Sequence, residues 1–154
     1  PNVGKSLFIN KLVGRSSART GDKPGVTRGR QWIRVAGSID LMDTPGILWP
    51  KLEDKEAAFH LAATGAIKEE VYDFYAVAGK LAHWLAENYP GALRERYKLD
   101  TLPVDQDELL EAIGAKRGYY VSGGMVDTLN SARIVLKEFR EGKLGRYTLD
   151  EPGQ

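Results

Sequence analysis

The sequence predicts an α/β fold with an incomplete sheet, followed by a small all-helical domain. Three observations support this class. A helix opens after Gly4, two short apolar runs flank Gly37, and from about Lys55 onward one helical pattern follows another. Because the character changes near residues 62–66, we predict one domain at residues 1–65 and a second at residues 66–154.

The first part contains one predicted helix and one predicted hairpin. Residues 5–13 carry apolar side chains at helical spacing, with Phe8 and Leu12 on one face. The segment 15–29 is polar and is broken by Pro24, which is typical of a loop. Two runs that follow predict an antiparallel hairpin, with strands at Gln31–Ala36 and Ser38–Met42.

The second part is predicted to be helical throughout. The expected helices are Lys55–Thr64, Ile67–Asn88, Leu93–Tyr97, Asp107–Ile113 and Met125–Glu141. The longest carries an apolar stripe at helical intervals, made of Val71, Phe74, Val77, Ala78, Leu81, Trp84 and Leu85. We expect its aromatic members to be core residues and not a ligand cage.

Composition narrows the class of protein. The chain is 42% hydrophobic and 28% charged, which indicates a globular domain and not a disordered or membrane-spanning one. It contains no cysteine, so neither a disulfide nor a cysteine zinc site is expected. Between Lys11 and Arg34, seven basic residues meet one acid, Asp22. This segment suits a polyanionic partner, although an ordinary solvated surface explains it equally well.

The first six residues resemble a phosphate-binding loop. Pro1-Asn2-Val3-Gly4-Lys5-Ser6 is the second half of the pattern G-x-x-x-x-G-K-[ST], whose first glycine is expected two residues before Pro1. A glycine lets backbone N–H groups approach phosphates at the start of a helix. The Lys5 ammonium is expected to reach the outer phosphates, and the Ser6 hydroxyl is expected to bind Mg²⁺.

Two later motifs follow in the order that a GTP-hydrolysing enzyme needs. Thr27 lies in a loop from which its hydroxyl can reach Mg²⁺. Asp43 ends a strand and can hold a Mg²⁺-bound water, and the Gly46 N–H can contact the γ-phosphate. Each motif alone also fits a simple turn, but the ordered set predicts a nucleotide site.

The base-reading motif Asn-Lys-x-Asp does not follow Gly46, where only helices are predicted. Asn10-Lys11 shares the first two residues, but it lies inside a helix and lacks the aspartate. Either this half of the site has been lost, or it precedes Pro1, which would define a circular permutation. The partial loop at Pro1 favours the second interpretation.

These motifs resemble the circularly permuted GTPases of the ribosome biogenesis GTPase A type. The matching blocks are Pro1–Ser6, Lys23–Thr27, Gln31-Trp32, Asp43–Pro50, Leu61–Lys68, Tyr89-Pro90, Arg94–Leu99, Ala112–Arg117 and Ser122–Gly124. The resemblance implies a cytoplasmic or organellar enzyme that binds GTP and GDP, contacts the maturing large ribosomal subunit and its rRNA, and has no membrane span. The helical domain would contribute to the rRNA contact.

The resemblance also assigns individual residues. It assigns the phosphates to Asn2, Val3, Gly4, Lys5, Ser6 and Leu7, the γ-phosphate to Gly46, and Mg²⁺ to Ser6 and Thr27. Asn2 matches relatives in which an asparagine helps to hold K⁺. Ile47 stands where related enzymes place a water-orienting glutamine, so no catalytic residue is assigned. His60 and His83 lie in predicted helices and are not expected to be catalytic.

One helix face suggests an RNA contact. Arg133, Lys137 and Arg140 are spaced i, i+4 and i+7 beside an apolar stripe, and Lys116-Arg117 is expected nearby. A solvated face, partly neutralised by Glu138 and Glu141, is the alternative.

The leading prediction is a GTPase that acts in large-subunit assembly. The alternatives are a nucleotide-independent RNA- or protein-binding module and a linear tRNA-modification or assembly GTPase. The isolated chain is expected to be nearly inactive because it lacks the base-reading motif.

Overall fold

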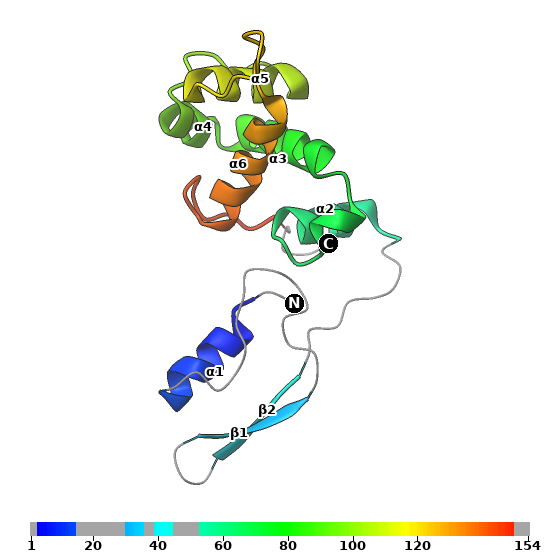
Figure 1. Cartoon of the computed structure of the whole chain (residues 1–154), viewed down its shortest axis with the longest axis vertical. Helices are drawn as coiled ribbons and strands as arrows, with labels where there is room; N and C mark the ends of the chain where they lie inside the picture. Colours follow the sequence, from blue (N-terminus) through cyan, green and yellow to red (C-terminus); the bar gives the residue numbers. More distant parts are fainter. Residues whose placement is uncertain (1–2, 15–29, 36–38, 45–52, 150–154) are drawn as a thin grey trace. The chain divides into compact units, whose positions relative to one another are not determined.

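The computed structural model describes residues 3–14, 30–35, 39–44 and 53–149. Along the chain lie α1 (Lys5–Val13), β1 (Gln31–Val35), β2 (Ile39–Asp43), α2 (Lys55–Ala63) and a 3₁₀ turn, η1 (Glu69–Val71). Then come α3 (Phe74–Asn88), α4 (Pro90–Tyr97), α5 (Gln106–Arg117) and α6 (Thr128–Arg140). The mixed α/β class with a helical second part is confirmed (Figure 1).

The chain divides into two compact units. The first comprises residues 1–61 and 65–71, and the second comprises residues 62–64 and 72–154. No described helix is both long and apolar enough to cross a membrane.

In the first unit, the predicted hairpin is confirmed. β1 and β2 pair antiparallel, with Gln31 opposite Asp43 and Val35 opposite Ile39. Side chains alternate along β1, so that Ile33 is buried while Trp32 is exposed. Ile33 packs against Ile9 of α1. The hairpin and the helix therefore share one small apolar core.

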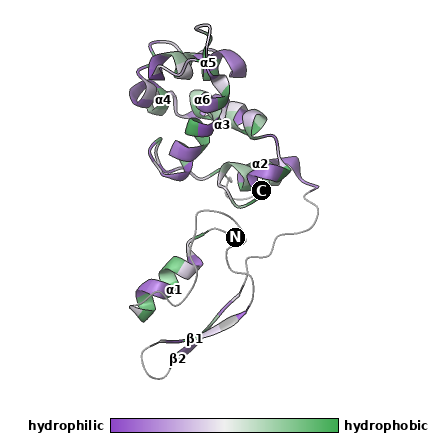
Figure 2. Cartoon of the chain, viewed as in Figure 1, coloured by the Kyte–Doolittle hydropathy of each residue, from purple (hydrophilic) through white to green (hydrophobic). Residues whose placement is uncertain are grey.

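α1 has the bounds that the sequence predicts, Lys5–Val13. Ile9 is buried, whereas Phe8 and Leu12 are 63% and 49% exposed. Figure 2 shows hydrophobic and hydrophilic residues alternating along α1. The face that carries Phe8 and Leu12 is thus not part of the core among the residues that the structure describes.

In the second unit, the core lies between α3, α5 and α6, with α4 beside α3. The stripe predicted on α3 supplies Ala78, Leu81 and Leu85, all fully buried. Trp84 of the same stripe packs against Tyr89 and Tyr147, with ring centroids 5.4 and 6.2 Å away. Trp84 is therefore half-buried in an aromatic cluster and does not belong to the fully buried core, and its expected role as a core residue and not part of a ligand cage stays a prediction.

The predicted helix Ile67–Asn88 is wrong at its start. Asp73 is the N-cap of α3, and its carboxylate accepts hydrogen bonds from the N–H groups of Tyr75 and Ala76. The cap separates α3 from the 3₁₀ turn Glu69–Val71. Val71 is therefore 70% exposed and does not belong to the buried stripe.

The other helix bounds also shift for local reasons. α4 begins earlier than predicted, at Pro90, because a proline is well suited to the first turn of a helix. α5 extends to Arg117, where Gly118 takes the left-handed conformation with φ 73°. α6 begins at Thr128 and not at Met125, because Asp127 caps it by accepting from the Asn130 N–H.

Gly114 marks a close contact between α5 and α6. A Cβ atom at this position would overlap Ser131 Oγ and Val126 Cγ1. We predict that Gly114→Ala lowers the free energy of unfolding by about 1–3 kcal/mol, although alanine favours helices, because the packed side chains have to move. Urea denaturation would measure the change.

Gly91 of α4 is the matched control, because a Cβ atom there would meet nothing within 4 Å. Gly91→Ala should leave the stability equal or slightly higher. Equal stability of the two variants would contradict the tight packing of α5 against α6.

Candidate nucleotide and metal site

The N-terminus of α1 has the geometry of an anion-binding helix start. Gly4 occupies the N-cap position in the left-handed conformation, with φ 82° and ψ 12°, and no side chain caps the helix. Left-handed backbone is strained for residues with a Cβ, which explains the glycine. The first N–H groups of a helix have no acceptor within the helix and attract anions.

An ion pair joins the start of α1 to the end of β2. The Lys5 ammonium contacts the carboxylate of Asp43, which is the last residue of β2 and is fully buried. A buried carboxylate requires a charged or hydrogen-bonding partner, because its transfer from water is costly. The structure therefore brings together Lys5 and Asp43, two predicted site residues that are 38 positions apart in the sequence.

The structure describes only some of the remaining residues that are predicted to bind phosphate or metal. Ser6 lies half-buried on the first turn of α1, and Val3 and Leu7 are exposed, at 86% and 54%. Asn2, Thr27, Gly46 and Ile47 lie outside the described residues. The ligand roles of all these positions stay predictions.

The described donors fit Mg²⁺. The Ser6 hydroxyl follows Lys5 on α1, and Lys5 itself touches the Asp43 carboxylate. Hydroxyl and carboxylate oxygens are hard ligands of the kind that Mg²⁺ prefers, together with phosphate oxygens and water. Within residues 3–14, 30–35, 39–44 and 53–149, no group of three His, Cys, Asp or Glu side chains could hold a metal by itself.

Comparison with known proteins identifies the family. Residues 1–92 match the sequence model of the family described as 50S ribosome-binding GTPase. The chain belongs to the 50S ribosome-binding GTPase family.

The chain is similar along its whole length to individual members of this family. It is 47% identical over 154 residues to "Ribosome biogenesis GTPase A" of Priestia megaterium, covering 100% of this chain and 54% of that relative. The protein of the same name from Bacillus cereus is 48% identical over 152 residues, covering 99% and 51%. The chain thus spans about half the length of these curated relatives.

A solved structure supports the fold of this family member. The crystal structure of GNP-bound YlqF from T. maritima matches with a TM-score of 0.63 and 25% identity, covering 99% of this chain and 57% of that one. The similarity therefore extends over the residues of both compact units.

The basic residues predicted to bind RNA differ in their surroundings. Lys116 Nζ lies 3.1 Å from Asp100 Oδ2, and the Arg133 guanidinium lies 5.0 Å from the centre of the Phe74 ring. Lys137 is exposed on α6. Arg117 and Arg140 form part-buried hydrogen bonds within the helical unit. The contact of these five basic residues with RNA stays a prediction.

Sequence analysis missed the central role of Glu138. Its carboxylate, 7% exposed, accepts a hydrogen bond of 3.0 Å from Arg96 of α4 and one of 3.3 Å from Arg117 of α5. Glu138 was predicted only to neutralise the basic face of its helix. Its place among the buried positions of α6 was the signal that could have revealed the three-helix contact.

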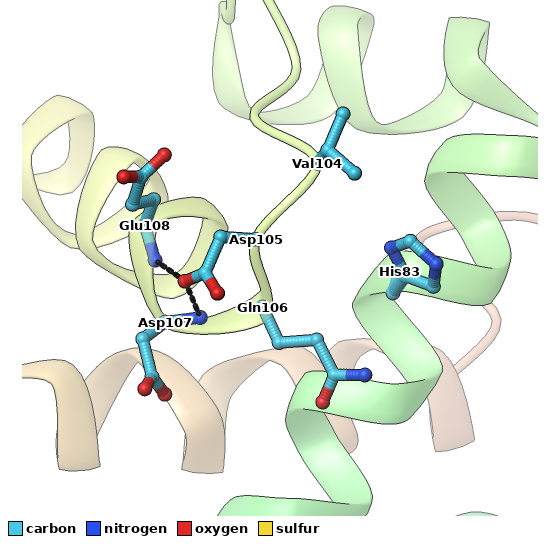
Figure 3. Close-up of a pocket in the computed structure, with 6 residues that line it drawn as sticks. All are labelled: His83, Val104, Asp105, Gln106, Asp107 and Glu108. Carbon is cyan, nitrogen blue, oxygen red and sulfur yellow. Dashed lines mark hydrogen bonds between the residues drawn. The ribbon is translucent and has the colours of Figure 1, made fainter.

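An acidic hollow in the helical unit is explained by helix capping. It is lined by His83 of α3 and by residues 104–108 before and within α5. Figure 3 shows that Asp105 accepts hydrogen bonds from the N–H groups of Asp107 and Glu108. His83 Nε2 lies 3.3 Å from Glu87 Oε1 on its own helix. The hydrogen bonds of Asp105 therefore cap the N-terminus of α5.

The contacts of Glu138 make the stability of the helical unit depend on pH. Burial by itself would raise the pKa of Glu138, but the Arg96 hydrogen bonds and the charge of Arg117 outweigh it and lower the pKa. A carboxylate with a lowered pKa stabilises the fold above its unfolded pKa and loses this effect as the pH falls through the folded pKa.

We therefore predict that stability falls below about pH 4.3 and that Glu138→Gln removes this part of the pH dependence. At pH 7 the variant should be less stable by about 1–3 kcal/mol, because two arginines lose their acceptor charge. Urea unfolding at a series of pH values from 7 down to about 3 would test this. Glu111→Gln, at an exposed position of α5, is the control and should change neither quantity. An unchanged pH profile in Glu138→Gln would contradict the prediction.

Proposed function

We propose that the full-length protein binds and hydrolyses GTP and acts in the assembly of the large ribosomal subunit in the cytoplasm. The observation that carries the proposal is the Lys5–Asp43 pair at the N-terminus of α1. It is supported by the family match of residues 1–92 and by relatives named as ribosome biogenesis GTPases along the whole chain.

The proposed chemistry gives a role to each predicted site residue. The phosphates of GTP lie against the N–H groups at the start of α1, where Lys5 exchanges its contact with Asp43 for the outer phosphates. Ser6, Thr27 and Asp43 would hold Mg²⁺, directly or through its water, and the ion would supply positive charge where phosphoryl transfer builds up negative charge. Asn2 would help to hold K⁺ beside the phosphates, and the Gly46 N–H would contact the γ-phosphate.

Nucleotide binding is coupled to the RNA partner. In the proposed cycle, Thr27 contacts Mg²⁺ when GTP is bound, and this state prepares the basic residues between Lys11 and Arg34 for rRNA. Hydrolysis releases the RNA. Ile47 cannot orient water through a side-chain hydrogen bond, so water must be positioned by another group.

A nucleotide-independent RNA- or protein-binding module is the second candidate, favoured by the basic segment alone. A linear tRNA-modification GTPase is a weaker candidate, because the similarity to ribosome biogenesis GTPases includes the helical unit. Nucleotide titration of the full-length protein separates binding of GTP from an RNA-only role.

We predict that Lys5→Ala in the full-length protein weakens GTP and GDP binding by about 100-fold, because a charge-assisted phosphate contact is lost. Lys11→Ala is the control, since Lys11 lies in the last turn of the same helix and is exposed. It should bind nucleotide as the wild type does. Equal affinities of wild type and Lys5→Ala, measured by calorimetry, would disprove the phosphate role of Lys5.

For RNA binding, Lys137 gives a clean test because it is exposed on α6. Lys137→Glu should weaken binding to the large subunit and reduce the slope of log K against log salt concentration by about one unit. Arg94→Glu, at an exposed position of α4, has the same charge change and should have a smaller effect. Equal effects of the two variants would indicate non-specific attraction and would refute a defined contact at Lys137.

A further inference from the structure

The C-terminal end of α2 is held by an arginine from α6. Arg140 Nε donates to the Ala63 carbonyl at 3.0 Å, and Arg140 Nη2 donates to the Ala62 carbonyl at 2.9 Å. The same Nη2 lies 2.9 Å from the Tyr72 hydroxyl. One guanidinium thus binds the last turn of α2 and the segment that leads to α3.

This contact meets a requirement of the helix end. The last carbonyls of any helix have no partner within the helix, and buried ones need a donor. Ala62 and Ala63 are 2% and 0% exposed. The preceding carbonyl, of Leu61, accepts the Ala66 N–H at 2.8 Å. Arg140 supplies the next two donors, and its positive charge suits the negative end of the helix dipole.

α2 is the helix that belongs to both compact units. It runs from Lys55 to Ala63, and the division between the units falls after Leu61. In the sequence it follows Asp43, the buried partner of Lys5. Its last turn, residues 62–64, is grouped with the helical unit that contains Arg140.

A second charged residue of α6, close to Arg140, connects this helix to α4 and α5. Glu138, two residues earlier on α6, binds Arg96 of α4 and Arg117 of α5. A displacement of the end of α2 would therefore act on α6 through Arg140 and on α4 and α5 through Glu138. Coupling between distant sites needs such a connected element with two arrangements that both sites can bias.

We propose that Arg140 is the positioning residue that transmits the nucleotide state from α2 to the helical unit. The proposal rests on the function proposed above, because it needs a site at Lys5 and Asp43 that responds to GTP. It assigns the Arg140 charge to the fold, and not to the RNA contact predicted from the spacing of Arg133, Lys137 and Arg140.

Hydrogen exchange of the full-length protein tests the proposal. Amides of α6 and of residues 141–149 should exchange at rates that differ by about fivefold or more between the GDP state and a non-hydrolysable GTP analogue. In Arg140→Gln, the ratio of the exchange rates in the two nucleotide states should be close to one. Amides of α1 should keep their nucleotide response, because Lys5 and Ser6 are unchanged.

Two further variants separate geometry from charge. Arg140→Lys keeps the charge but cannot bond two carbonyls and Tyr72 with a planar fork, so its ratio should also fall. Arg94→Gln removes a charge from an exposed position of α4 and should keep the wild-type ratio. Tyr72→Phe removes one acceptor from Arg140 and should give a ratio between those of the wild type and Arg140→Gln. If Arg140→Gln fails to fold, Tyr72→Phe tests the role of Arg140 in its place.

The outcomes distinguish the two proposals. If α1 shows no nucleotide response in the wild type, the proposed function fails. If α1 responds but α6 does not, or if the ratio of the folded Arg140 variants equals that of the wild type, the role of Arg140 is refuted. A wild-type ratio in Arg140→Gln together with weaker RNA binding in both nucleotide states would instead assign Arg140 to the RNA surface.

Discussion

The pairing of Lys5 with Asp43 is the constraint on which the site depends. A carboxylate with no solvent exposure at the end of β2 needs a cation, and the first residue of α1 supplies it. The Ile9–Ile33 core holds α1 against the hairpin and so keeps the two charges together. A protein that binds phosphate can use this pair, because a lysine that already neutralises one anion at a helix start is placed to meet a second.

In the helical unit, charged side chains connect helices instead of covering them. Glu138 lies among buried residues of α6 and reaches α4 and α5, while Arg140 reaches α2. Removal of one partner from such a contact is costly, because it leaves a buried charge without its partner. The charge pattern of α6 therefore describes internal connections as much as an external surface.

Local patterns allowed most of the elements to be predicted, but not the side-chain contacts between them. The hairpin and α1 could be predicted because alternation and helical spacing act within a few residues. The long helix at 67–88 was wrong because the Asp73 cap overrides a continuous apolar stripe. The basic spacing on α6 could not reveal that Arg140 binds Ala62 and Ala63, because these residues are more than 75 positions away in the sequence.

The proposed link through α2 would act in both directions. If the nucleotide changes the affinity of the helical unit for its partner by some factor, the partner changes nucleotide affinity by the same factor. Under the proposed function, binding of the helical unit to a ribosomal particle would therefore alter the retention of GTP at the proposed site near Lys5. The proposed GTPase has Ile47 in place of a water-orienting side chain, and it would respond to its partner through α2 because Arg140 holds the end of this helix.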